Sequence, residues 1–261
     1  MSGFLVLLLE RRAGALVARL TIERPEKRNA LGRAALAELA DALRGISADS
    51  SVRAVVLTGA GEQAFAGGAD VAELAALDAS SAREFITRVH EACAALRECP
   101  VPVVARVNGI ALGVGLELAA ACDLRIAAQG ARFGMPEVRL GVPSVVEAAL
   151  LPRLVGAGRA RWLVLTGETI DAREALAWGL VERVVPGAEL DTAVDAALDA
   201  ILASGAEAVR TQKRLCKLWE EAPLSESVRA SIDAFAASYA SGEPQRLIGA
   251  YLAQRAKERG A

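Results

Sequence analysis

Histidine and aromatic residues are scarce in this chain of 261 residues. It has one histidine, His90, and only 4% of its residues are Phe, Trp or Tyr, although 53% are hydrophobic. The core must therefore be built mainly from Ala, Val and Leu, and a chain of this length can bury a substantial one. His90 lies in a charge-rich helical pattern with no sequence partner for catalysis or metal binding, so we expect it on the surface or at an interface. Zinc sites and Ser/His/Asp triads are disfavoured.

Cysteine pairs, long apolar runs and an excess of one charge are also missing. Cys93, Cys99, Cys122 and Cys216 show no CxxC spacing and lie in apolar surroundings, which is typical of reduced core thiols in a cytoplasmic protein. The formal net charge is -2, without blocks of like charge, so neither nucleic acid nor an anionic membrane surface is an expected partner. Residues 4–9 form a short apolar run without signal-peptide flanks, and no run elsewhere reaches a membrane span.

Strand and helix patterns alternate along the chain. Residues 4–9 and 15–22 predict a hairpin, and residues 52–58 predict a buried strand. Asn29 is a candidate cap for a helix from residue 30 to about residue 45, whose apolar stripe would face the core. This alternation favours an α/β or mixed ββα architecture. Four further helical patterns occupy most of residues 188–259.

The central stretch, residues 101–123, runs from a strand through a glycine-rich turn into a helix. Asn108 and Gly109 form a turn dipeptide that tolerates positive φ, and the helix begins near Gly113. Its first turn exposes unpaired N–H groups, among them that of Val114, and Glu117 lies three residues further on the same face. One rigid element would then hold a donor for a developing negative oxygen close to a carboxylate that can move a proton. The alternative is that the glycines serve packing and the acid complements the helix dipole.

Residues 64–70 form a second glycine-rich loop between a strand and a helix. The paired glycines allow close approach of backbone to a ligand, and Ala69 presents its N–H just before a helix start. It would supply the second donor of an oxyanion hole, although a simple tight turn is the alternative. The nearby Gly59-Ala-Gly61 resembles a dinucleotide fingerprint, but a loop follows it where the fingerprint requires a helix. We therefore do not expect a nicotinamide or flavin cofactor.

A second acid, Glu137, follows a proline in a loop twenty residues after Glu117. Two carboxylates in a mostly apolar pocket would repel, so one pKa should rise and the pair could divide into an acid and a base around one water. The sequence leaves open whether the two acids meet.

Several of these motifs, in this order and spacing, resemble successive signatures of the enoyl-CoA hydratase/isomerase (crotonase) superfamily. The resemblance covers about residues 4–259, essentially the whole chain. The matching segments are Pro25–Leu31, Ala64–Asp70, Asn108–Glu117, Ala121–Asp123 and Phe133–Glu137, followed by Leu165–Glu168 and Ala172–Pro186.

The resemblance implies the fold and the partners. It implies an α/β fold in which residues 1–190 form a crotonase-like spiral of ββα units, and residues 191–261 form a helical C-terminal trimerisation region. The expected assembly is a homotrimer or a dimer of trimers. The expected substrate is an acyl-CoA thioester, with no metal or redox cofactor.

The resemblance also implies roles for particular residues. The oxyanion donors fall on Ala69 and Val114, and the hydratase carboxylates on Glu117 and Glu137. The acyl pocket would include Gly113, Val142 and Glu147. The positions matched to CoA binding are Lys27, Arg28, Ala30, Ala66, Gly67, Gly68 and Asp70.

Glu147 and Val114 depart from the common family pattern. Glu147 is an extra acid, which either reshapes the acyl pocket or, as we favour, forms a capping box with Ser144 at a helix start. Val114 stands where the family commonly has Gly; it keeps the N–H but narrows acyl access.

The implied activity is addition of water across a 2-trans-enoyl-CoA, with Glu137 delivering the proton to C2. One alternative is a Δ3,Δ2-enoyl-CoA isomerase, which would tolerate loss of Glu117 better than loss of Glu137. Another is an inactive family member that binds acyl-CoA or a protein partner, and retention of both acids argues against it.

Overall fold

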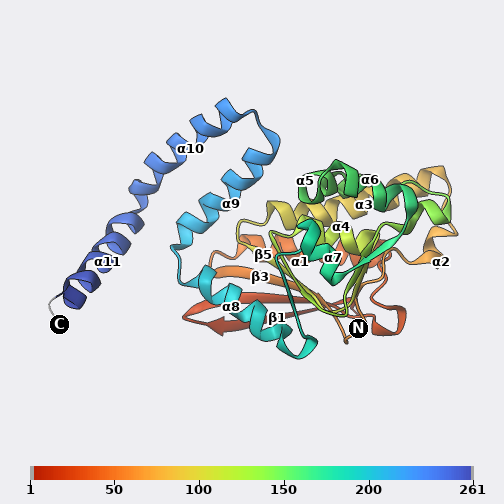
Figure 1. Ribbon diagram of the computed structural model, residues 1–261, viewed down its shortest axis with the longest axis horizontal. Coiled ribbons are helices and arrows are strands. Elements are labelled where there is room, and N and C mark those ends of the chain that lie inside the picture. Colours follow the sequence, from red (N-terminus) through yellow and green to blue (C-terminus); the bar gives the residue numbers. More distant parts are fainter. Residues whose placement is uncertain (1–2, 260–261) are drawn as a thin grey trace. The chain divides into compact units, whose positions relative to one another are not determined.

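The strands pair into two sheets in the computed structural model, which describes residues 3–259 (Figure 1). The larger sheet has the order β1 (Leu5–Arg12), β2 (Ala15–Ile22), β3 (Val52–Gly59), β5 (Val103–Val107), β7 (Leu124–Ala128) and β10 (Arg183–Val185). The smaller sheet has the order β4 (Ala64–Ala66), β6 (Ile110–Leu112), β8 (Arg132–Gly134) and β9 (Thr169–Asp171).

The chain winds as a spiral between these sheets. The successive strand pairs β3 and β4, β5 and β6, and β7 and β8 each contribute one strand to the larger sheet and the next to the smaller sheet. The pairings are parallel except for β1 with β2 and β8 with β9. The predicted hairpin and the mixed ββα architecture are therefore confirmed.

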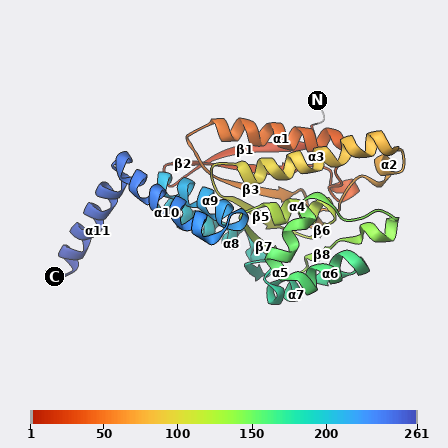
Figure 2. The same ribbon diagram turned by 90° about the horizontal axis from the view of Figure 1, so that it is seen from above.

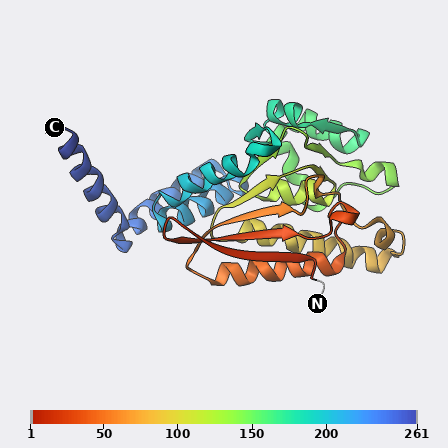
Figure 3. The same ribbon diagram turned by 90° about the horizontal axis from the view of Figure 1, so that it is seen from below.

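Helices follow the strand pairs and cover the sheets. Helices α1 and α3 lie side by side along the larger sheet, and α3 also packs on α4 (Figures 2 and 3). The α-helices up to residue 202 are α1 (Arg33–Ala48), α2 (Val71–Leu74), α3 (Ala79–Glu98), α4 (Val114–Ala121), α5 (Leu151–Val155), α6 (Ala157–Thr166), α7 (Ala172–Trp178) and α8 (Leu190–Leu202). Short 3-10 helices are η1 (Pro25–Lys27), η2 (Pro136–Leu140), η3 (Val146–Leu150) and η4 (Gly187–Glu189).

Helix α1 buries its predicted apolar stripe, but its start differs from the prediction. The helix begins at Arg33 with Gly32 as its N-cap, so the predicted cap by Asn29 is wrong. The buried Asn29 amide instead donates to the carbonyl oxygens of Ala60 and Ala64, at 3.0 and 2.8 Å. A buried amide must satisfy its own hydrogen bonds, and here it ties two loops together.

Asn108 and Gly109, between β5 and β6, are also used differently from the prediction. Neither residue has a positive φ. The Asn108 amide donates to the carbonyl oxygens of Gly59, Gly61 and Ala64, so one side chain fixes the connection from β3 to β4. A Cβ at Gly109 would clash with the backbone of Gln63. Close backbone approach, and not a left-handed turn, is therefore the reason for this glycine.

The chain divides into two compact units, Met1–Leu198 and Asp199–Ala261. The predicted boundary after residue 190 lies at the start of α8, whereas the division falls inside that helix. In the second unit, α9 packs against α10. Its elements are α9 (Ala206–Glu221), α10 (Leu224–Ser238), η5 (Tyr239–Ser241) and α11 (Glu243–Arg259).

Three of the four cysteines lie in the core as predicted. Cys93, Cys99 and Cys122 are buried and in no disulfide among the described residues, whereas Cys216 is exposed on α9, so its predicted core position is wrong. The helical period places Cys216 on the polar face of an amphipathic helix. No helix among residues 3–259 combines the length and hydropathy needed to span a bilayer.

Candidate active site

A cavity of about 670 Å³ in the first unit brings together segments that are distant in the sequence. Its walls come from the loop after β4, from α2 and α3, from the start of α4, and from η2 with the loop that follows it. The predicted site residues that line it are Gly67, Gly68, Ala69, Gly113, Val114, Glu117, Glu137 and Val142.

The two candidate oxyanion donors, Ala69 and Val114, both line this cavity. Val114 is the first residue of α4, where an N–H has no carbonyl of its own helix to bond. Leu31 and Ala69 form an isolated β-bridge, in which the Leu31 N–H donates to the Gly68 carbonyl and the Leu31 carbonyl accepts the Asp70 N–H. In this pairing the N–H of Ala69 points away from Leu31. The local backbone therefore leaves both donors for a ligand.

Glu117 and Glu137 meet at this cavity. Glu117 is only 3% exposed in the first turn of α4, and its Oε1 accepts a hydrogen bond from the Ala148 N–H at 3.1 Å. Burial, followed by the charge of Glu137, raises the pKa of Glu117 to about 8. The rise expected for one of two paired acids is thus found at Glu117. Glu137, in η2, accepts a hydrogen bond at Oε2 from the Ser144 hydroxyl at 2.8 Å.

Two glycines explain how an acid from η2 comes to lie over α4. Gly113, the N-cap of α4, has a φ of 51°, and a Cβ there would clash with Oε1 of Glu137. A Cβ at Gly115 would clash with the Ala66 carbonyl on β4. Glycine at these two positions therefore allows both the strand and the Glu137 carboxyl to approach the first turn of α4 closely.

Apart from Val142, the apolar part of the cavity was not identified in the sequence. It is formed largely by side chains from α2 and α3 and by residues after Glu137. These are Val71, Leu74, Leu77, Phe85, Ile86, Leu140, Val142 and Val145. For the other side chains, the only signal in the sequence was the predicted inward position of Phe85 on α3. Helical spacing does not separate cavity lining from ordinary core packing.

Most residues matched to CoA binding lie away from the cavity wall. Gly67 and Gly68 line the cavity, whereas Lys27, Arg28, Ala30, Ala66 and Asp70 do not. Lys27 and Arg28 are exposed, while Ala66 is fully buried in β4.

The Asp70 carboxylate has protein partners of its own. It accepts the Ala72 N–H at the start of α2, and it binds Arg24 and Lys27 at 3.0 and 3.4 Å. Burial acts against ionisation, but the hydrogen bonds from Arg24, Ala72 and Lys27 lower the pKa of Asp70 overall. Asp70 thus organises the loop between β4 and α2. The sequence motif did not indicate these contacts with Arg24, Lys27 and Ala72.

Glu147 does not form the predicted capping box. The 3-10 helix η3 has Val145 as its N-cap and no side-chain cap, while the Ser144 hydroxyl binds Glu137 instead. Glu147 is 6% exposed and does not line the cavity; its Oε1 lies 2.8 Å from Nδ1 of His90 on α3. His90 is exposed as predicted, but it has this buried partner from a segment 57 residues away.

The raised pKa of Glu117 predicts a measurable effect on stability. Because the folded protein holds this proton more tightly than the unfolded chain, the stabilisation is present below the ordinary value of 4.5 and is lost as pH rises towards 8. The shift corresponds to at most about 5 kcal/mol at 1.36 kcal/mol per pKa unit. The free energy of unfolding, measured with urea at several pH values across this range, should decline in wild type but not in Glu117→Gln. The control Glu62→Gln, which removes an exposed acid, should show the same decline as wild type. An equal decline in Glu117→Gln would contradict the raised pKa of Glu117.

The fold and the cavity define the class of enzyme first. A two-sheet ββα spiral, with backbone donors and carboxyls around an apolar cavity, is the architecture of crotonase-type enzymes. The sequence profile of the enoyl-CoA hydratase/isomerase family matches residues 12–258, and the chain belongs to that family.

Individual relatives agree with this assignment. The chain is 38% identical to a crotonyl-CoA hydratase of Syntrophomonas wolfei over 240 residues, which cover 92% of each protein. It is 36% identical to a short-chain-enoyl-CoA hydratase of Clostridium acetobutylicum, again over 92% of each. A solved structure of an enoyl-CoA hydratase from Mycobacterium smegmatis superimposes with a TM-score of 0.90 at 33% identity, covering 95% of this chain and 96% of that one. The fold expected from the family resemblance is therefore confirmed.

Proposed function

We propose that this protein is an enoyl-CoA hydratase that adds water across a 2-trans-enoyl-CoA thioester. The observation that carries the proposal is the meeting of Glu117 and Glu137 in one cavity with the candidate donors Ala69 and Val114. The relatives named as crotonyl-CoA and short-chain-enoyl-CoA hydratases support the same activity and suggest a short acyl chain.

The backbone donors stabilise the negative charge that forms during addition. In this mechanism the thioester oxygen lies between the N–H groups of Ala69 and Val114. When the water oxygen bonds to C3, the double-bond electrons shift towards the thioester and its oxygen gains enolate charge. Donors fixed in a water-poor cavity stabilise that charge more than they stabilise the neutral thioester, and this difference accelerates the reaction.

The two glutamates hold the water and manage its protons. Because the pKa of Glu117 is raised to about 8, the pair retains one proton at neutral pH that an exposed pair would have lost. In this mechanism the proton passes from Glu117 to Glu137 before reaction, and Glu117 then accepts a proton from the water as its oxygen adds to C3. Glu137 then donates its proton to C2, which completes the 3-hydroxyacyl thioester. One water molecule is thus added to each substrate molecule, and no metal or redox cofactor takes part in this mechanism.

The CoA moiety is assigned to the exposed turn beside the glycine loop. Lys27 and Arg28 supply cations for its phosphates, and the backbone of Gly67 and Gly68 lies beside the thioester end. The cavity on the α2 and α3 side, lined by apolar side chains, is left for the acyl chain. Buried cysteines outside disulfides are typical of a reducing compartment, which supports a cytoplasmic location.

Parallel assays distinguish hydration from isomerisation. The purified protein is given crotonyl-CoA and, separately, a 3-enoyl-CoA, and the products are separated by mass and retention. The proposal predicts 3-hydroxybutyryl-CoA from the first substrate. Conversion of the 3-enoyl-CoA alone would favour the isomerase, while binding of both esters without turnover would favour an inactive acyl-CoA-binding protein.

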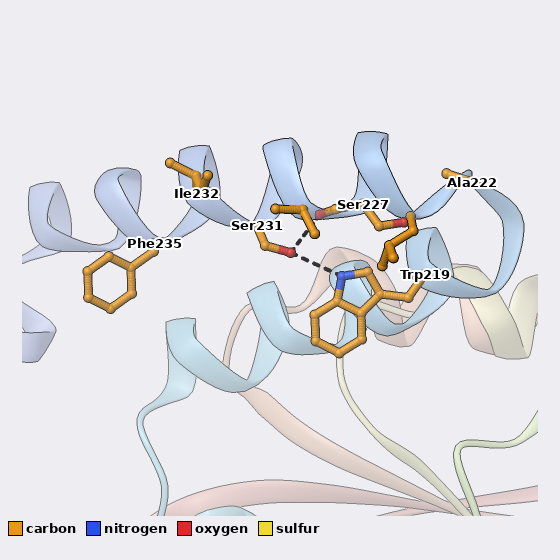
Figure 4. Close-up of a pocket in the computed structure, with 8 residues that line it drawn as sticks. Trp219, Ala222, Ser227, Ser231, Ile232 and Phe235 are labelled. Atoms are coloured by element: carbon orange, nitrogen blue, oxygen red, sulfur yellow. Dashed lines mark hydrogen bonds between the residues drawn. The ribbon is translucent and has the colours of Figure 1, made fainter.

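The second unit supports the proposed self-association. Helix α10 exposes apolar side chains, including Val228, Ile232 and Phe235 at 50%, 64% and 68%. Figure 4 shows Ile232 and Phe235 following Ser231, whose hydroxyl accepts the Trp219 indole N–H at 3.1 Å. A monomer seldom exposes a continuous apolar face of this kind. We assign it to contact with further copies of this chain, in a trimer or a pair of trimers.

Charges on this face should prevent assembly. The double variant Ile232→Asp and Phe235→Asp is expected to shift the mass measured by light scattering from that of a trimer or hexamer to that of a monomer. Desolvating two carboxylates in an apolar interface is costly. The control Glu226→Arg, at an exposed position of α10 that is not a helical neighbour of Ile232 or Phe235, should leave the mass unchanged. A wild-type mass equal to one chain would contradict this assignment.

A further inference from the structure

Glu147 is a buried acid that the proposed chemistry does not use. It is 6% exposed, and its Oε1 lies 2.8 Å from Nδ1 of His90. Within the part of the chain that the structure describes, Oε2 of Glu147 has no hydrogen-bond partner. Burying a carboxylate is costly unless it is compensated, so simple space filling does not account for this residue.

The turn that carries Glu147 also holds Glu117. The next residue in η3, Ala148, donates its N–H to Oε1 of Glu117 at 3.1 Å. The preceding residue, Val146, has a φ of 41°, a conformation that is rare for a β-branched side chain. Such a turn persists only where its surroundings hold it in place. Helices α3 and α4 both pack on η3, and the contact between His90 and Glu147 is a side-chain tie from α3 to this turn.

Glu147 also influences Glu117 through its charge. Burial raises the pKa of Glu117 most, the charge of Glu137 adds to it, and the charge of Glu147 adds further. The Ala148 N–H bond acts in the opposite direction, because it favours the ionised carboxyl. The segment that contains Glu147 therefore both places and electrostatically tunes the catalytic carboxyl.

Other ionisable groups lie around this cluster, and Arg44, Glu91 and Glu98 line a surface hollow together with His90. From α3, His90 and the buried thiol of Cys93 face Glu147; burial raises the pKa of that thiol, and the charges of Glu147 and Glu117 raise it further. Beyond the far end of α4, the Arg125 guanidinium binds Glu182 and donates to the carbonyl oxygens of Ala119 and Cys122.

We propose that His90 and Glu147 are positioning residues for Glu117: their contact holds the turn that presents the Ala148 N–H, and Glu147 places a second negative charge behind the catalytic carboxyl. This inference rests on the proposed hydratase function, in which Glu117 accepts the proton of the water. Neither residue lines the cavity assigned to the substrate.

The charge effect is tested with Glu147→Gln, which keeps an oxygen for His90 but removes the charge. In wild type, kcat/KM for crotonyl-CoA should fall as pH rises through about 8, where the glutamate pair loses its remaining proton. In Glu147→Gln this alkaline limb should move to lower pH by about one unit, because a neighbouring negative charge has been removed. Glu84→Gln, an equal charge change at an exposed position of α3, should leave the limb in place. Superimposable profiles for wild type and Glu147→Gln would overturn the charge role.

The holding role is tested at His90. His90→Ala removes the tie and should lower kcat about tenfold or more, since small displacements of a catalytic group are costly. His90→Asn, whose amide can replace the Nδ1 contact, should restore most of kcat, with KM similar in both variants. Equal activity in His90→Ala and wild type would overturn this role.

A titration without turnover separates this inference from the hydratase assignment. The Glu117 carboxyl, labelled with carbon-13 and identified by its loss in Glu117→Gln, is followed by NMR in the unligated protein. Its midpoint should be lower in Glu147→Gln than in wild type, and equal midpoints would overturn the inference. Lack of hydration by wild type with a shifted midpoint would instead refute the proposed function while leaving the coupling intact.

Discussion

Replacing Glu137 by Gln is expected to lower kcat for crotonyl-CoA hydration by about 10²- to 10⁴-fold, the usual contribution of a general acid or base. The amide has nearly the same shape and can still accept the Ser144 hydroxyl, but it cannot deliver a proton to C2. The loss should therefore appear in kcat, with KM changing much less. Steady-state rates across a range of crotonyl-CoA concentrations measure both quantities.

The exposed acid Glu168 provides a matched control for this substitution. Glu168→Gln changes the net charge equally but lies outside the cavity, so its kinetics should match wild type. Unfolding midpoints should show that both variants are folded. A folded Glu137→Gln variant with a kcat near that of wild type would contradict the assignment of Glu137 as the proton donor.

Removing the Val114 N–H is expected to have the second largest effect. Val114→Pro deletes this donor at the first position of α4, where proline is tolerated because its nitrogen needs no helical partner. Loss of one oxyanion donor typically lowers kcat about 10²- to 10³-fold. Stopped-assay product formation at saturating crotonyl-CoA would measure the loss.

Val114→Ala is the matched control, because it trims the side chain but keeps the N–H. It should retain most of the activity, and it should widen acyl access at the cost of some stability, since Val114 is buried. Similar activities in folded Val114→Pro and Val114→Ala would exclude this N–H as an essential donor.

Much of the fold was predictable because local patterns and tertiary packing agree. Strand β2 begins and ends where its apolar pattern predicts, and the stripe of α1 faces the core. The errors fall on residues whose side chains serve long-range contacts. Asn29 has the chemistry of a helix cap, but its amide is used 35 residues away, and sequence spacing does not reveal such a partner.

The candidate site was predictable to the extent that its groups lie in glycine-rich segments. Gly113 and Val114 identified the start of α4, and Glu117 follows on the same helix. That Glu117 meets Glu137 depends on how η2 folds back over Gly113, which only the structure shows. For Glu147, the sequence pattern pointed to the wrong partner. Its spacing from Ser144 fits a capping box, but tertiary packing pairs it with His90 instead.

The central claim is that this cavity hydrates an enoyl thioester, and the most direct test is the initial rate of crotonyl-CoA hydration by the purified protein. The product is identified by mass spectrometry in ¹⁸O-labelled water, with Glu137→Gln measured alongside. The account predicts rapid formation of 3-hydroxybutyryl-CoA carrying one labelled oxygen, and near loss of that product in the variant. A folded wild-type protein that binds crotonyl-CoA but leaves its double bond unhydrated would contradict the account.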